Sequence, residues 1–296
     1  MKLKIPAILF LTLALGHGAF AQNEVSKIDS HLEGFSRQLT AVIPNAAVQT
    51  NTYADAWIGK FVPSLPMHFA VGIDGSVTQL DIKDLSNAAK MTGIYSIPDS
   101  FLFPTINFNA RLGGIFLPFD AGFSFSMVNT EKLGRTFEKI DFEYFAIGGD
   151  LRYALLKGIG PLPQLSVGAG YYYVNTSIGK SAGSQEVKSS STMQAIVAEA
   201  QLSKTIIFFT PFIGFRGIWS EADSSYSWKS SAGLNNGMTV VHSGSGSVKT
   251  EFKDSFIPQI FGGFGFKIGT FELDATGSYD FKNEIWSAGA SIRFKL

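Results

Sequence analysis

The sequence predicts an all-β fold: an antiparallel transmembrane β-barrel of about ten strands, with eight to fourteen allowed, and one short N-terminal helix. Three observations support this prediction: a secretory signal, a C-terminal hairpin with strict two-residue alternation, and connections that alternate between short and long. Apart from the signal, the chain has no continuous apolar stretch approaching the ~20 residues of a spanning helix. Its apolar residues are therefore expected to span a membrane as strands.

The C-terminal segment, residues 271–296, predicts a hairpin with one apolar and one polar face. The apolar parity runs from Phe271 to Phe281 and, after a polar turn at 282–284, from Trp286 to Leu296. A secreted β-sandwich or β-helix can also alternate, but neither needs aromatic side chains at both ends of its strands, as a membrane does at its two headgroup levels. We therefore expect the apolar parity to face lipid and to carry an aromatic girdle of Tyr171, Tyr173, Trp219, Tyr279, Trp286 and Phe294.

The N-terminus predicts export. Two lysines precede an apolar run, residues 5–15, and Ala19-Phe20-Ala21 offers small residues to a signal peptidase, so residues 1–21 are expected to be a signal peptide. The apolar run is too short for the alternative, a membrane anchor. The chain has no cysteine, which excludes a lipid-modified N-terminus and a disulfide framework. The expected location is the bacterial cell outer membrane.

The next segment, residues 22–66, is expected to precede the barrel as a separate unit. Between Ser26 and Ile43 apolar side chains recur at three- and four-residue steps, which predicts an amphipathic helix that Pro44 ends. Two roles stay open for the segment: a periplasmic helical lead-in packed against the barrel mouth, or a plug folded into the lumen.

The barrel itself is expected to occupy residues 67–296. Its connections at 113–118, 157–163, 203–205 and 269–270 are short, which is typical of periplasmic turns. Four other connections are long and polar, which is typical of extracellular surface loops; they are 76–103, 129–139, 176–190 and 221–248. The ten strand-like segments are 67–75, 104–113, 118–128, 140–156, 163–175, 191–203, 206–220, 249–268, 270–281 and 284–296.

The parity opposite to the apolar one places charged side chains inside the barrel. Unpaired buried charges are very costly, so we expect these residues to form a salt-bridge lattice that holds the wall together. Glu272 and Arg293 should lie opposite each other across the last hairpin. A charge-selective narrow pore through the same residues is the alternative. The expected lattice consists of Arg111, Asp150, Arg152, Glu199, Arg216, Glu272, Asp274 and Arg293.

Histidines give little support for catalysis or metal binding. After the signal the chain has only His31, His68 and His242, and no cysteine, so neither a nucleophile–base pair nor a ligand spacing stands out. We predict no enzyme, no cofactor and no metal. A barrel enzyme of the omptin or lipase kind is the remote alternative.

Several stretches resemble a known group of proteins. FDAGFSF, YFAIGGDLRYALL and LPQLSVGAGYYYV are similar to segments of uncharacterised outer-membrane barrels of spirochaetes, loosely grouped with FadL-like fatty-acid channels. The resemblance implies an outer-membrane barrel and, for FadL-like members, a channel for small or hydrophobic solutes. Channels of the FadL kind have fourteen strands and an Asn-Pro-Ala hatch, to which Asn45-Ala46-Ala47 is the nearest match here.

The sequence thus leaves two main functions: a structural or surface-exposed barrel with long loops, and a narrow pore. The expected partners are outer-membrane lipid and the barrel-assembly machinery, with a small solute or a host-surface ligand in addition. A net charge of zero, without basic clusters, excludes nucleic acid.

Overall fold

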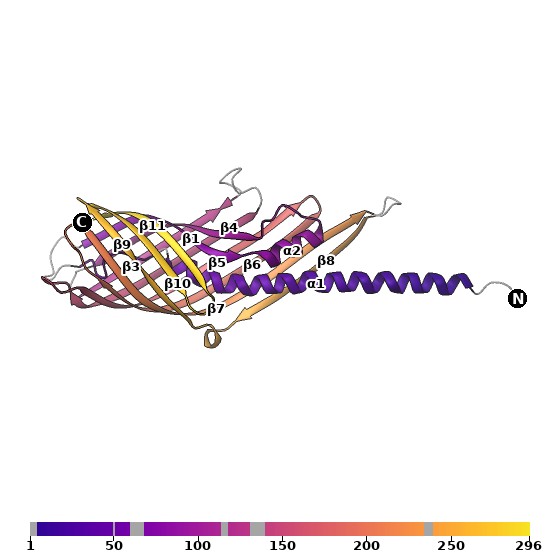
Figure 1. The fold of residues 1–296 in the computed structure, drawn as a ribbon, viewed down its shortest axis with the longest axis horizontal. Helices are drawn as coiled ribbons and strands as arrows, with labels where there is room; N and C mark the ends of the chain where they lie inside the picture. The colour runs from indigo at the N-terminus through magenta and orange to yellow at the C-terminus, as the bar shows by residue number, and fades with distance from the viewer. Residues whose placement is uncertain (1–4, 50, 60–67, 114–117, 131–139, 234–238) are drawn as a thin grey trace.

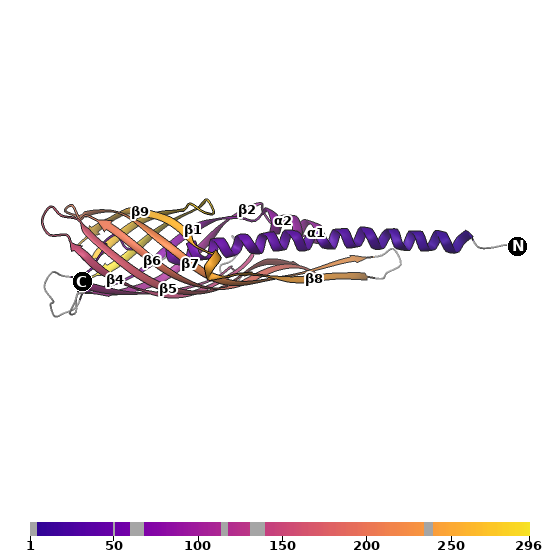
Figure 2. The same cartoon turned by 90° about the horizontal axis from the view of Figure 1, so that it is seen from below.

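The computed structural model describes residues 5–49, 51–59, 68–113, 118–130, 140–233 and 239–296. It contains an antiparallel barrel from which a long helix projects (Figures 1 and 2). The strands are β1 (His68–Asp81), β2 (Ser100–Gly113), β3 (Phe119–Asn129), β4 (Asp141–Lys157), β5 (Gln164–Ala182), β6 (Gln185–Ser203), β7 (Phe209–Gly233), β8 (Thr239–Thr250), β9 (Ile257–Ile268), β10 (Phe271–Asp280) and β11 (Ile285–Lys295).

Ten of these strands form a closed ring. Each strand from β1 to β7 pairs with its neighbour in sequence, β9 follows β7, and the ring closes where β1 pairs with β11. The remaining strand, β8, lies outside the ring and pairs with the second half of β7. The predicted fold class is therefore confirmed. We call the end of the barrel with the connections β2–β3, β4–β5, β6–β7 and β9–β10 the turn end, and the opposite end the hairpin end.

The polar segments predicted as long loops are largely regular structure. The stretch 176–190 is a continuation of β5 and β6 around Gly183, and 221–248 contains the rest of β7 and most of β8. Outside the membrane neither face of a strand has to be compatible with lipid. A serine-rich strand there has the composition of a loop, which is why the sequence predicted loops. The stretch 76–103 holds the end of β1 and the helix α2 (Lys83–Thr92), whereas most of 129–139 lies outside the described residues.

One predicted strand is divided in the structure. The segment 249–268 is interrupted by η3 (Phe252–Asp254), a short 3₁₀ turn that separates β8 from β9. At this point β7 changes its partner, since Ile218 pairs with Ile257 of β9 and Ala222 with Thr250 of β8.

The alternation of side chains follows the predicted register in the final hairpin. Trp286 and Ile292 are exposed on the outer wall, whereas Ser287 and Arg293 are buried inside. Large apolar side chains also cover the outer face of the other ring strands, among them Phe108, Phe123, Leu151, Ile196, Phe215 and Phe264. This apolar wall is what a barrel in lipid requires.

The N-terminal helix α1 (Ile5–Gln49) is longer than the predicted helix 26–43, because it begins at Ile5 and continues through Pro44. A proline inside a helix removes one backbone hydrogen bond and weakens the turn before it. In that turn the Asn45 side-chain amide donates to the Ala41 carbonyl oxygen at 3.0 Å, and the surrounding barrel encloses residues 42–49. The expectation that Pro44 ends the helix is therefore wrong. Within the described part of the chain, no helix combines the length and apolarity needed to cross a membrane.

Candidate functional site

The candidate functional site is the interior of the barrel, which the chain fills with its own residues 42–58. We call these residues the luminal segment; residue 50 is outside the described part. Its side chains and backbone contact β2, β3, β4, β6, β7, β9, β10 and β11, so the segment lies inside the ring.

The wall supplies charges to this interior. The charged residues that the sequence assigned to the lumen all point inward, and the structure brings them together in three groups.

The first group joins β2, β3 and β4. Arg111 contacts Asp120 at 2.6 Å and Asp150 at 2.8 Å, and the Arg152 guanidinium holds both oxygens of Asp120 at 2.8 Å. Paired geometry of this kind offsets the cost of burying the charges. Gly122 leaves room for the group, because a Cβ there would lie 2.5 Å from a guanidinium nitrogen of Arg111.

The second group joins β1, β10 and β11, and it differs from the predicted pairing. Glu272 and Arg293 are register partners on adjacent strands, as expected. Nevertheless Arg293 pairs with Asp74, at 2.6 Å, and with Asp274, while Glu272 pairs with Lys295 at 2.8 Å. The Arg293 side chain is long enough to reach the carboxylates that lie diagonally across its two neighbouring strands. Glu272 therefore pairs with Lys295 instead.

The third group holds the end of the helix. Arg216 lies 3.7 Å from Glu199, and it also donates to the Val48 carbonyl oxygen at 2.9 Å and to the Thr52 hydroxyl at 3.0 Å. Its guanidinium covers the ring of Phe261, 3.9 Å from the centroid. This arginine thus connects the wall to the luminal segment at the point where α1 ends.

Tyr53 lies between the first and the second charged group. Its ring is fully buried, with the guanidinium carbons of Arg293 and Arg111 at 3.9 Å and 4.7 Å from the centroid. Its hydroxyl donates to Asn109 Oδ1 at 2.5 Å. Cation–π contacts strengthen when they are removed from water, so the tyrosine gives the arginines a favourable place to pack.

The wall also binds the backbone of the luminal segment. Arg293 donates to the Thr52 carbonyl oxygen at 2.8 Å, Gln201 to that of Tyr53 at 2.7 Å and Arg152 to that of Asp55 at 3.1 Å. In the opposite direction, the Ala56 amide donates to Ser203 Oγ at 2.9 Å and the Ile58 amide to Asp120 at 3.0 Å. An irregular segment can lie at membrane depth only when its backbone groups are satisfied in this way. The Asp55 side chain pairs with Lys295.

In the hairpin-end half of the barrel the polar contacts come from the helix. Asn45 donates to Asp280 at 2.9 Å and accepts from Gln259 at 2.6 Å, and Gln49 donates to Thr276 at 2.7 Å. Two of the three wall partners, Gln259 and Thr276, are uncharged, and the third, Asp280, is a carboxylate.

Sequence reasoning missed several members of the site. Asp74, Asp120 and Lys295 have the inward parity of their strands, so the two-residue period could have identified them. Tyr53 and Asp55 lie in an irregular stretch without periodicity, and no sequence signal placed them in the lumen.

The histidines lie apart from the charged interior. His31 of α1 contacts Asp84 of α2 at 2.8 Å, His68 contacts the Leu296 carbonyl oxygen at 2.9 Å, and His242 is exposed on β8. Among the described residues, histidine, aspartate and glutamate side chains form no cluster of three or more that could hold a metal ion.

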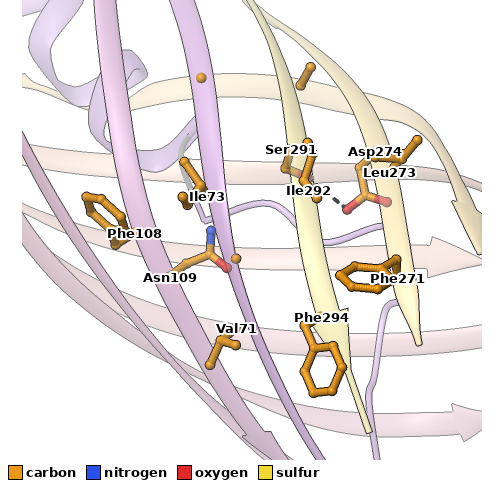
Figure 3. Close-up of a pocket in the computed structure, with 13 residues that line it drawn as sticks. Val71, Ile73, Phe108, Asn109, Phe271, Leu273, Asp274, Ser291, Ile292 and Phe294 are labelled. Carbon is orange, nitrogen blue, oxygen red and sulfur yellow. Dashed lines mark hydrogen bonds between the residues drawn. The ribbon is translucent and has the colours of Figure 1, made fainter.

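The outer wall carries the predicted girdle residues. Tyr171, Trp219, Tyr279 and Trp286 are exposed, and Tyr173 and Phe294 are partly so. An apolar groove of about 990 Å³ runs over β1, β2, β10 and β11 among Val71, Ile73, Phe108, Phe271, Leu273, Ile292 and Phe294 (Figure 3). Its lining also includes Asn109, Asp274 and Ser291 of the inward parity, but most of its residues are apolar and lie on the outer wall, so acyl chains are expected to fill it.

Comparisons with known proteins give similarity at the level of the fold. No family model and no curated protein sequence matches the chain. Among solved structures, it is similar to the outer membrane protease OmpT from Escherichia coli, with 10% identity over 80% of this chain and 98% of that chain and a TM-score of 0.45. It is also similar to the translocator domain of autotransporter NalP from Neisseria meningitidis, with 9% identity over 79% and 88% and a TM-score of 0.39. At these identities the likeness assigns no activity to this chain.

The closed ring, the apolar outer wall and the charged interior define an outer-membrane β-barrel protein, located in the bacterial outer membrane. No sequence match supports a narrower assignment to spirochaetal or FadL-like barrels.

Proposed function

We propose that this protein is a sealed outer-membrane barrel with a structural or surface role, and that the luminal segment is its plug. The observation that carries the proposal is the set of contacts between the wall and the backbone of residues 52–58. A barrel built to conduct would have no need to bind a peptide backbone from several sides.

The size of the barrel supports the proposal. Eight strands leave an interior that side chains just fill, and open aqueous channels appear near sixteen. An α-helix with its side chains is about 10–12 Å across, so one helix takes most of the space inside a ring of ten strands. Residues 42–49 are accordingly buried around the whole circumference of the helix.

We further propose that the hairpin end faces outward. Short turns are typical of the periplasmic side, and the extensions of β5, β6, β7 and β8 form a polar structure suited to the cell surface. A host-surface ligand would then meet these extensions, while lipid surrounds the ring.

The alternatives need an open path or a catalytic group. A narrow pore, or a FadL-like channel for small or hydrophobic solutes, would require the luminal segment to leave. No observation in the described residues favours a barrel enzyme over the sealed barrel.

Conductance in a planar lipid bilayer tests the proposal. We expect the full-length barrel to give little or no current, and a variant that lacks residues 24–58 to give steady openings. Circular dichroism and heat-dependent mobility on gels control for the folding of the variant. Large, steady conductance of the full-length barrel would overturn the proposal.

The variant Arg293→Ala separates the wall charges from the plug as the cause of closure. It removes the cation that pairs with Asp74 and Asp274, and with it one contact to the Thr52 carbonyl oxygen and one to the Tyr53 ring, but leaves Arg111, Arg152 and the helix in place. We expect it to stay silent, because residues 42–58 still occupy the lumen. Cation-selective current from this variant would show that the charge lattice, and not the segment, closes the barrel.

A further inference from the structure

The direction of α1 gives the chain an unusual path. The helix enters the ring at the hairpin end, and its N-terminal part runs outward beside α2 and the extended hairpins (Figures 1 and 2). β1 starts at the turn end, where His68 pairs with Gly113 of β2. Residues 51–58 lie in the lumen, where the Ile58 amide contacts Asp120 near the turn end, so the described chain runs through the lumen from the hairpin end toward the turn end.

Residues 24–39, which we call the displayed helix, are fixed on the hairpin-end side of the ring. Asp29 accepts from Trp228 Nε1 of β7 at 2.8 Å, and Ser36 lies 2.9 Å from Ser189 of β6, hydroxyl to hydroxyl. His31 contacts Asp84 of α2. These partners belong to the extensions beyond the ring, so the helix is held outside the membrane.

The apolar face of the displayed helix is also buried at this end. Ile28, Leu32, Phe35 and Leu39 are buried and belong to one core with apolar residues of α2 and of the extended hairpins. Without this helix the apolar side chains on the inner face of the extensions would be exposed to water. The hairpins and the helix therefore form one structure.

The turn-end half of the lumen could not hold the helix instead. There the side chains of Arg111, Arg152 and Arg293 converge on the ring of Tyr53. Beside these side chains the luminal segment is irregular and no longer helical after Gln49. A helix that approached from the turn end would meet this layer of arginines.

We propose that the barrel carries its own N-terminal segment across the outer membrane and displays residues 24–39 on the cell surface. The proposal rests on the outward orientation of the hairpin end given above. The expected signal cleavage leaves the new N-terminus in the periplasm, so the segment crosses either through the closed ring or while the ring closes around it. Both routes end with the exposed side chains of Ser26, Lys27, Ser30 and Arg37 in the medium.

Single cysteines test this topology, because the chain has none of its own. Ser30→Cys reports on the displayed helix, Ser245→Cys on the β8 extension and Ile159→Cys on the turn end; all three positions are exposed. With a membrane-impermeant maleimide on intact cells, we expect the first two to react as well as they do in lysed cells. Ile159→Cys should react only after the outer membrane is permeabilised.

The outcomes separate this proposal from the orientation on which it rests. Labelling of Ser245→Cys but not of Ser30→Cys on intact cells would overturn display of the helix and leave the orientation intact. Labelling of Ile159→Cys but not of Ser245→Cys would overturn the orientation, and the display with it.

A cross-link provides a second measurement on the assembled barrel. In the double variant Ser36→Cys, Ser189→Cys the two sulfur atoms should meet, since the native hydroxyls are 2.9 Å apart. We expect mild oxidation of outer membranes to form the disulfide in most molecules, seen as a shift in gel mobility. The pair Ser36→Cys, Ser245→Cys is the control and should not cross-link. Failure of the first pair in a folded barrel would overturn docking of the helix on the hairpins.

Discussion

Replacement of Tyr53 tests how firmly the wall holds the luminal segment. Tyr53→Ala removes a fully buried ring between Arg293 and Arg111, whose guanidinium carbons lie 3.9 Å and 4.7 Å from its centroid. Loss of a buried aromatic side chain costs about 3–5 kcal/mol of unfolding free energy. The stacked arginines lose their cation–π contacts as well, so we expect a value in the upper part of this range.

Tyr53→Phe is the matched control for this change. It keeps the ring and both arginine contacts and loses only the hydroxyl donor to Asn109, a net loss of about 0.5–1.5 kcal/mol. Urea unfolding of each variant in lipid vesicles measures the two free energies, and bilayer recordings should show brief openings for Tyr53→Ala only. If both variants lost the same small amount, the ring would not be seated among the arginines and the argument for a firmly held plug would fail.

Three further changes test other parts of the structure. Asp120→Ala leaves two buried guanidinium groups without their shared carboxylate, and equilibrium unfolding should show a loss of about 3–5 kcal/mol; a loss below 1 kcal/mol would mean that the group is hydrated. Ala275→Arg on the lipid face should cost about 2–4 kcal/mol on folding into lipid, whereas Ser225→Arg on the exposed face of β7 should cost little; equal effects would contradict the register. Hydrogen bonds from Ser86 and then from Lys90 lower the pKa of Asp99. The stability that the Asp99 carboxylate gives to the loop after α2 is therefore fully present above the ordinary pKa of about 3.9, and it is lost as pH falls through the lowered value. Hydrogen exchange of α2, compared between the wild type and Asp99→Asn, should differ at pH 5 and converge in strong acid; no difference at pH 5 would remove this role.

The two-residue period accounts for what the sequence could predict. It identified the ring strands and the inward parity of residues such as Arg111 and Arg293, because one face of each strand must suit lipid. It could not predict which carboxylate pairs with which arginine. Arg293 reaches diagonally to Asp74 on β1 and to Asp274 on β10, and this depends on side-chain length and barrel curvature more than on strand register.

The helix and the extensions show a different limit. Pro44 and the serine-rich composition of 176–190 are local signals for a break and for loops. Tertiary contacts override both signals, since the barrel encloses the helix around Pro44 and the displayed helix covers the inner face of the extended hairpins. The path of the luminal segment depends on contacts with distant strands, which a pattern within residues 51–58 does not contain.

The change of partner along β7 has a consequence for variation in this kind of barrel. The edge of β7 is covered first by β9 and then by β8, and between them the Ser220 amide donates to Ser255 Oγ at 2.7 Å. Closure of the ring therefore depends only on the half of β7 that pairs with β9. Residues 222–250 can be lengthened, shortened or exchanged without a change in the number or stagger of the strands in lipid. Insertion of a foreign epitope at this hairpin would alter the exposed surface of the protein and leave the lipid-facing surface of the ring unchanged.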